Sequence, residues 1–121
     1  MLHTAVDKAA NLLTLRFSHR VAPAEAERAT IEARRLLPDL KTGFRLLADL
    51  SGLELMDFAC VPEVKKMMDL CNHHGVSKVV RVIPDPHKDI GLNILSLFHY
   101  DRRVHIVTCE TLEEALKLLA G

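Results

Sequence analysis

Three side chains are of the types that a nucleophilic active site uses. A cysteine or serine nucleophile needs a histidine base and an acid that orients this base. Cys109, His19 and Glu110 supply these types near one edge of the expected fold, but no nucleophile-elbow motif joins them in the sequence. We therefore expect that this protein is not an enzyme and that it has no catalytic residues.

The seven histidines raise the question of a metal site. His73 and His74 are adjacent, so on a helix they point about 100 degrees apart, and their simplest role is a favourable position at the negative end of that helix. A site built from His99, Asp101 and His105 is the alternative, because these residues flank one turn. We expect no bound metal.

Nucleotide-binding fingerprints are absent from the sequence. It contains neither G-x-x-x-x-G-K-[ST] nor G-x-G-x-x-G, and only five glycines in all. We therefore expect no cofactor.

The composition is that of one globular domain over residues 1–121. Apolar residues make up 49% of the chain and charged residues 26%, and sixteen basic side chains balance sixteen acidic ones. This neutrality argues against nucleic acid as a partner. No apolar run reaches the roughly 20 residues that span a bilayer, and the first residues do not resemble a secretion signal, so we expect a cytoplasmic protein without membrane insertion. The odd number of cysteines favours reduced, buried thiols at Cys60, Cys71 and Cys109.

Apolar periodicity predicts strands that alternate with helices. Residues 44–50 form an apolar run typical of a strand buried on both faces, and residues 51–57 are expected to form a turn into a helix over 58–74. Gly75 is expected to end that helix. Further strands are predicted over 2–6, 12–17, 78–83 and 104–107, and further helices over 23–37, from Pro86, and after a capping box at 111–114.

The resulting order is strand, strand, helix, strand, helix, strand, helix, strand, helix. Such alternation predicts an α/β fold, with a single-layer, mostly parallel sheet covered by helices.

The carboxyl ends of parallel strands gather at one edge of a sheet, and this edge is where open α/β folds usually place a site. Helices that begin there offer unpaired N–H groups to an anion or to a partner's carboxylate. The alternative is that Asp57, Asp85 and Thr111 cap their own helices. The residues expected in the loops at this edge are Ser18, His19, Arg20, Ser51, Asp57, Pro84, Asp85, His87, Thr108, Cys109 and Glu110.

The run of Phe98, His99 and Tyr100 holds two of the five aromatic residues. Phe98 fits the buried stripe of the third helix, whereas Tyr100 is expected to lie outside it. Either the run closes an ordinary amphipathic helix, or it forms a patch for a partner or for a second copy.

Two segments resemble the STAS domain family, which includes anti-anti-sigma factors and the cytosolic domains of sulfate transporters. LADLSGLELMD at residues 47–57 is similar to the family's central strand and its Met-Asp entry to a helix, and TLEEALKLL at 111–119 is similar to its closing helix. The resemblance covers nearly the whole chain and implies a STAS-like fold with a non-catalytic regulatory function.

In the anti-anti-sigma factors, a hydroxyl residue two positions after that Asp accepts phosphate, and the added charge disrupts docking. The matching residue here is Ala59, which has no hydroxyl, and Cys60 stands where the family has Gly. Pro62 also departs from a position that is usually small. Ser51 is a nearby hydroxyl at a position that the family uses for a turn.

We therefore predict a regulatory module whose protein partner binds near the start of this helix, with Phe58 exposed and Asp57 setting the local charge. A homodimer is also possible. The alternative is a small-ligand domain for an anion or an acyl chain, with a pocket at the carboxyl edge of roughly 300 Å³ or more. The predicted binding residues are Ser51, Asp57, Phe58, Ala59, Cys60, Pro62, Asp85 and His87.

Overall fold

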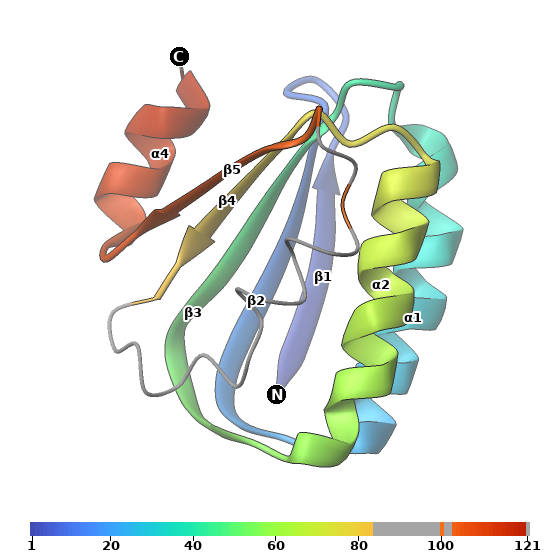
Figure 1. Cartoon of the computed structure of the whole chain (residues 1–121), viewed down its shortest axis with the longest axis vertical. Coiled ribbons are helices and arrows are strands. Elements are labelled where there is room, and N and C mark those ends of the chain that lie inside the picture. Colours follow the sequence, from blue (N-terminus) through green and yellow to red (C-terminus); the bar gives the residue numbers. More distant parts are fainter. Residues whose placement is uncertain (84–99, 101–102, 121) are drawn as a thin grey trace.

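Five strands form a single sheet in the order β1-β2-β3-β4-β5 in the computed structural model, which describes residues 1–83, 100 and 103–120 (Figure 1). β1 pairs antiparallel with β2, and every later pair is parallel. The predicted α/β fold with a mostly parallel sheet is therefore confirmed. The strands are β1 (Leu2–Asp7), β2 (Leu12–Val21), β3 (Arg45–Met56), β4 (Lys78–Val82) and β5 (His105–Cys109).

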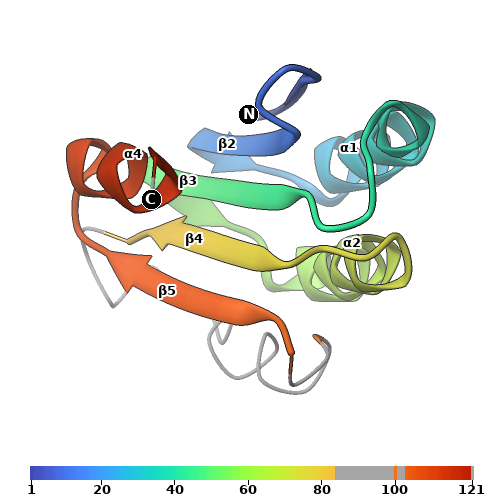
Figure 2. The ribbon, with the colours of Figure 1, turned by 90° about the horizontal axis from the view of Figure 1, so that it is seen from above.

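Helices cover both faces of the sheet. Figure 2 shows α1 (Pro23–Leu36) and α2 (Val61–His73) on one face and α4 (Leu112–Ala120) on the other. Two short 3-10 helices complete the described elements, η1 (Leu37–Asp39) and η2 (Phe58–Cys60). The helix predicted from Pro86 lies outside the described residues. None of the described helices is both long and apolar enough to cross a membrane.

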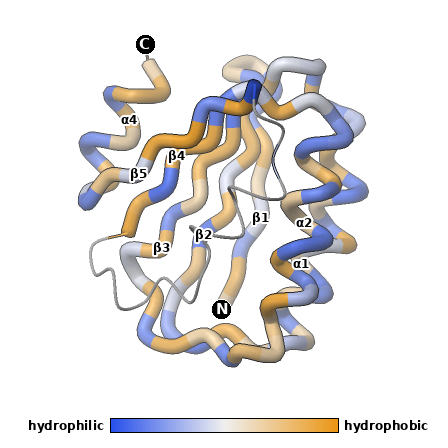
Figure 3. Tube along the Cα trace, viewed as in Figure 1, coloured by the Kyte–Doolittle hydropathy of each residue, from blue (hydrophilic) through white to orange (hydrophobic). Residues whose placement is uncertain are grey.

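β3 supplies buried side chains to both faces, as its apolar run predicts. Leu46 and Leu50 belong to the core beneath α1 and α2, whereas Leu47 packs with Val80 in the core beneath α4. In Figure 3 the strands carry hydrophobic residues along much of their length, while hydrophobic and hydrophilic residues alternate along α1 and α2. The sheet is therefore the shared layer between two separate cores.

Side chains of the two central strands hold the end of α4. The Arg45 guanidinium donates to the carbonyl of Leu119, and Lys78 Nζ donates to the carbonyl of Leu118 at 2.7 Å. At the other end, the Glu114 N–H donates to Thr111 Oγ1 at 3.1 Å, which confirms the predicted cap at Thr111.

β2 and β3 are both longer than predicted. The turn expected over residues 51–57 is instead strand up to Met56, and residues 18–20 continue β2. Two shifts in the β2–β3 register, beside Ser18 and between His19 and Arg20, interrupt the alternation on which strand prediction depends. The left-handed backbone of His19 (φ 53°) lies at the second shift.

A hydrogen bond between two glycines links the turn after α2 to the loop before β3. Gly75 follows the helix with φ 92°, as predicted for its C-terminal turn, and Gly43 has φ 90°. The Gly43 N–H donates to the Gly75 carbonyl at 2.7 Å. A Cβ at residue 75 would lie 2.6 Å from Thr42 Cγ2, whereas a Cβ at residue 43 would meet nothing within 4 Å. A substitution at Gly43 would therefore cost backbone strain alone, whereas one at Gly75 would add a steric clash.

We expect Gly43→Ala to lower the free energy of unfolding by about 1–2 kcal/mol, the cost of a left-handed backbone for a residue with a Cβ. Gly75→Ala should cost more, because the new methyl group also collides with Thr42. Adding Thr42→Ser to Gly75→Ala should restore part of the loss, since it removes Cγ2. Urea unfolding of the three variants measures this, and equal losses for the two alanine variants would contradict the steric account.

Candidate functional site

β2 and β3 extend past the neighbouring strands and carry the start of α2 with them. β4 ends at Val82, which pairs with Asp49, whereas β3 continues to Met56 beside the end of β2 (Figure 1). Because β3 and β4 are parallel, Asp57 and the end of β4 lie at the same carboxyl edge of the sheet, but β3 extends seven residues beyond its last pairing with β4.

The carbonyl of Val21, at the end of β2, fixes the chain that follows β3. It accepts a hydrogen bond from the Asp57 N–H at 3.2 Å and another from Cys60 Sγ at 3.5 Å. Asp57 Oδ1 in turn accepts the Ala59 N–H at 2.8 Å. Asp57 is therefore the cap of η2, which confirms the capping alternative for this residue.

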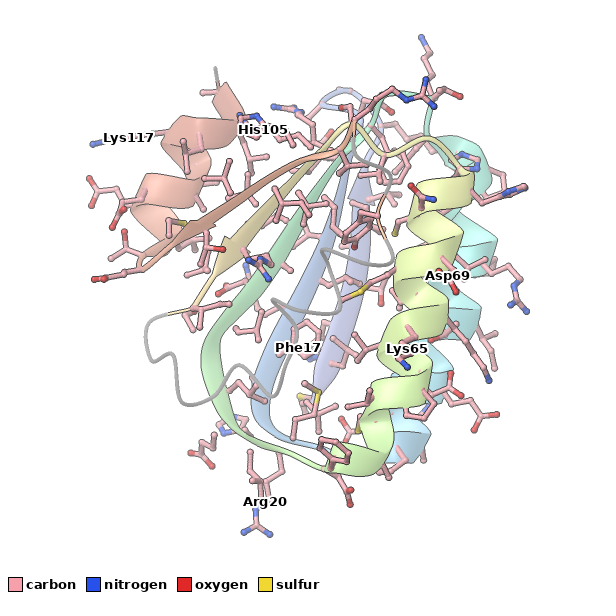
Figure 4. The ribbon with its side chains drawn as sticks, in the orientation of Figure 1. Phe17, Arg20, Lys65, Asp69, His105 and Lys117 are labelled. Carbon is pink, nitrogen blue, oxygen red and sulfur yellow. The ribbon has the colours of Figure 1, made fainter. Side chains whose placement is uncertain are left out.

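Two apolar residues next to these fixed points are exposed. The Phe58 side chain is 76% exposed and Leu55, just before it, is 55% exposed. Exposed apolar side chains that lie together mark interaction sites, whereas single ones are common on folded proteins. We name this region the rim surface and define it by Arg20, Leu55, Phe58, Ala59 and Pro62, all of which are exposed. In Figure 4, Arg20 points away from the domain at this end.

The rim surface contains three of the eight predicted binding residues. Phe58, Ala59 and Pro62 lie on it, and Asp57 is exposed beside it. Cys60 was predicted here but is fully buried, because its thiol points back toward Val21. Burial, and secondarily the charge of Asp57, raises the pKa of the Cys60 thiol.

Ser51 is not a turn residue and does not belong to the rim surface. It lies within β3, where its Oγ donates to Asp49 Oδ1 at 2.6 Å and its N–H donates to the same oxygen at 3.0 Å. Asp49 is buried, and its other oxygen lies 3.5 Å from Arg16 Nε. Ser51 therefore helps to satisfy a buried carboxylate. Asp85 and His87 lie outside the described residues.

The residues considered for nucleophilic chemistry do not meet. His19 is in β2 and Cys109 is at the end of β5, with β3 and β4 between them. Cys109 is buried, and its Sγ donates to the Arg81 carbonyl at 3.5 Å. The expectation that these side chains share one loop edge is wrong, because residues 18–20, 108 and 109 all belong to strands.

Neither the metal set nor the aromatic run forms a site in the part of the chain that the structure describes. No three potential metal ligands come together there, and His99 and Asp101 lie outside it. Tyr100 is buried in the core beneath α1 and α2, so the prediction that it lies outside the core is wrong. Burial raises the pKa of its hydroxyl well above the usual value.

A small apolar cavity lies between the sheet and the α1–α2 layer. Its volume is about 50 Å³, and its walls include Phe17, Leu50, Met67 and Tyr100. A drug-sized ligand needs roughly 300 Å³ or more. The cavity also lies inside the core, not at the carboxyl edge where the ligand hypothesis placed a pocket.

Sequence reasoning did not identify Leu55 as a surface residue, and it placed Arg20 in a loop at this edge, whereas Arg20 belongs to β2. Leu55 stands between Leu53 and Met56, which are both buried, so its outward position follows from the irregular β2–β3 pairing and not from its apolar character. Arg20 is directly paired with Leu55 in that register. Only the extension of β2 to Val21 brings the two together.

Comparison with solved structures shows which known fold this chain has. No family model matches the sequence, and no curated protein does. Among solved structures, the Bacillus cell fate determinant SpoIIAA in its phosphorylated form aligns over 98% of this chain and 99% of its own, with a TM-score of 0.66 and 14% identity. The chain has a SpoIIAA-like fold.

Two further structures share this SpoIIAA-like fold. An uncharacterised DUF3478-family protein from Shewanella loihica PV-4 covers 98% of this chain and 92% of its own at a TM-score of 0.69 and 12% identity. An anti-sigma factor antagonist from Mycobacterium paratuberculosis covers 100% of this chain and 96% of its own at a TM-score of 0.61 and 16% identity. At this level of identity the likeness is one of fold.

We expect the three native thiols to react slowly with Ellman's reagent. All three cysteines are free and buried, and burial raises the pKa of Cys71 to about 12. Because the thiolate is the reactive form, Cys71 at pH 8 should hold roughly a thousandfold less of it than an ordinary cysteine. Unfolding in guanidinium should release three fast-reacting thiols. A thiol that reacts in the native protein as fast as free cysteine would contradict the burial described here.

Proposed function

We propose that this protein is a non-catalytic regulatory module that binds a protein partner through the rim surface. The observation that carries the proposal is the exposure of Phe58 on a backbone held at both sides, by Asp57 before it and by Cys60 after it. An exposed aromatic side chain on a fixed backbone loses only its own rotamer freedom when a partner covers it. Such side chains are typical anchors of protein interfaces.

The composition of the rim surface also fits a protein partner. Leu55, Phe58 and Pro62 offer apolar area, while Arg20 and the Asp57 carboxylate supply one charge of each sign at its border. An apolar centre with a charged margin is the usual anatomy of a protein interface. Balanced charge favours neither nucleic acid nor an anionic surface.

Ala59 sets this module apart from a phosphorylation switch. Its side chain is exposed on η2 and carries no hydroxyl, so it cannot accept phosphate. The resemblance to anti-anti-sigma factors places their phosphoacceptor at this position. We infer that docking at the rim surface is not regulated by phosphate on residue 59.

The ligand hypothesis has less support. The cavity beneath α1 and α2 is several times smaller than a ligand pocket, and the Tyr100 side chain forms part of its wall. A larger groove of about 400 Å³ is lined by residues 1–4 and by residues of α1, and by none of the residues predicted for binding.

Phe58→Asp should abolish partner binding without unfolding the domain. Removing a central aromatic anchor typically costs at least about 2 kcal/mol of binding, or roughly thirtyfold in affinity. Because Phe58 is exposed, we expect its replacement to change the free energy of unfolding by less than about 0.5 kcal/mol. Quantitative affinity capture from the source cell, followed by titration with the captured protein, measures the loss.

The matched control is Ile31→Asp, which places the same charge on a side chain that is 59% exposed in the middle of α1. This variant should keep the partner. Retention of the partner by Phe58→Asp, or equal loss by both variants, would overturn the assignment of binding to the rim surface.

A further inference from the structure

In the part of the chain that the structure describes, β1 leaves one edge of the sheet open. There it pairs only with β2, and it stands at the end of the strand order. Met1 and Ser18 exchange two backbone hydrogen bonds, of 2.6 Å and 2.8 Å. In an antiparallel ladder this pattern repeats at every second residue, so the N–H and C=O groups of His3, Ala5 and Asp7 point toward β2. The N–H and C=O groups of the intervening residues Leu2, Thr4 and Val6 therefore point to the open side.

We propose that two copies of this chain pair through this edge, β1 against β1, with Ala5 on the two-fold axis. The result is one continuous ten-stranded sheet. A two-fold axis makes the paired strands antiparallel, and the outward groups must meet outward groups, so even-numbered residues pair with even-numbered residues. This restricts the axis to a few positions along β1.

The pairing of His3 with Asp7 favours an axis at Ala5 over an axis at the other positions. With Ala5 on the axis, His3 of each copy lies opposite Asp7 of the other, twice over, on one face of the sheet. An axis at Thr4 would instead place His3 opposite Ala5. Imidazole and carboxylate side chains directly opposite each other on neighbouring strands attract, and both His3 and Asp7 are exposed in the single chain.

The opposite face has room for the second copy. With Ala5 on the axis, Thr4 exchanges both backbone hydrogen bonds with Val6 of the second copy. The Val6 side chain then lies beside Thr4, on the side facing α1. A groove of about 400 Å³ runs there between β1 and α1, lined in part by Leu2, Thr4 and Ala29. Ala5 itself is small and exposed, so the two copies can approach closely at the axis.

The pairing should be reversible. A six-residue strand edge buries less than the roughly 1,200–2,000 Å² typical of stable interfaces. The β1 edge shares no residue with the rim surface, which is formed by β2, β3, η2 and α2.

Disulfide trapping tests the axis directly. In the proposed pairing the two Ala5 Cα atoms lie about 4.5–5.5 Å apart, within the range of a disulfide, whereas the two His3 residues are separated by about four residues, or roughly 13 Å. Ala5→Cys should therefore form a covalent dimer under mild oxidation at least about tenfold faster than His3→Cys at the same concentration. The native cysteines are buried and should stay reduced. Equal rates, or no dimer from a folded Ala5→Cys protein, would overturn the proposal.

Sedimentation equilibrium of charge variants gives a second, independent readout. His3→Glu places like charges opposite each other twice and should weaken association about tenfold, whereas His3→Lys should strengthen it. Thermal unfolding of both variants verifies that the single chain is intact. A wild-type protein that stays monomeric at millimolar concentration, or variants that associate equally, would also overturn the proposal.

Discussion

The parallel pairing of β2 with β3 is the constraint on which the rest of the structure depends. It continues past Asp49, where β4 stops, to the last residue of each strand, Val21 and Met56. The Val21 carbonyl then receives the hydrogen bonds that turn the chain into η2. Without this extension, Phe58 would not project from a fixed backbone, and α2 would begin elsewhere.

The fold could be predicted because its central strand is buried on both faces. Such a strand produces a continuous apolar run, and the flanking helices show their own period and their own terminal signals, such as Gly75 and the cap at Thr111. The true length of β3 could not be predicted. After Leu50 the buried residues are Leu53 and Met56, three apart, because the register shifts against β2 and the two-residue period is lost.

The candidate site could be predicted in part. The resemblance pointed to the start of α2, and Phe58 and Pro62 are exposed there as expected. Cys60 was misplaced, because a cysteine near a helix start gives no local sign of which way its thiol points. Arg20 was expected in a loop, and its place beside Leu55 depends on strand pairing between distant segments. The burial of Cys60 and the position of Arg20 therefore depend on contacts between distant segments, which the local sequence pattern does not reveal.

Hydrogen–deuterium exchange with and without the captured partner tests the central claim most directly. If the extended β2–β3 pair presents the rim surface as a rigid platform, the amides of β3 that donate to β2 should exchange slowly in the free protein. The partner should then add protection over residues 55–62 and leave α4 unchanged. Protection confined to α4 or to the middle of α1, or rapid exchange in the free protein of those amides of residues 51–56 that donate to β2, would contradict the account.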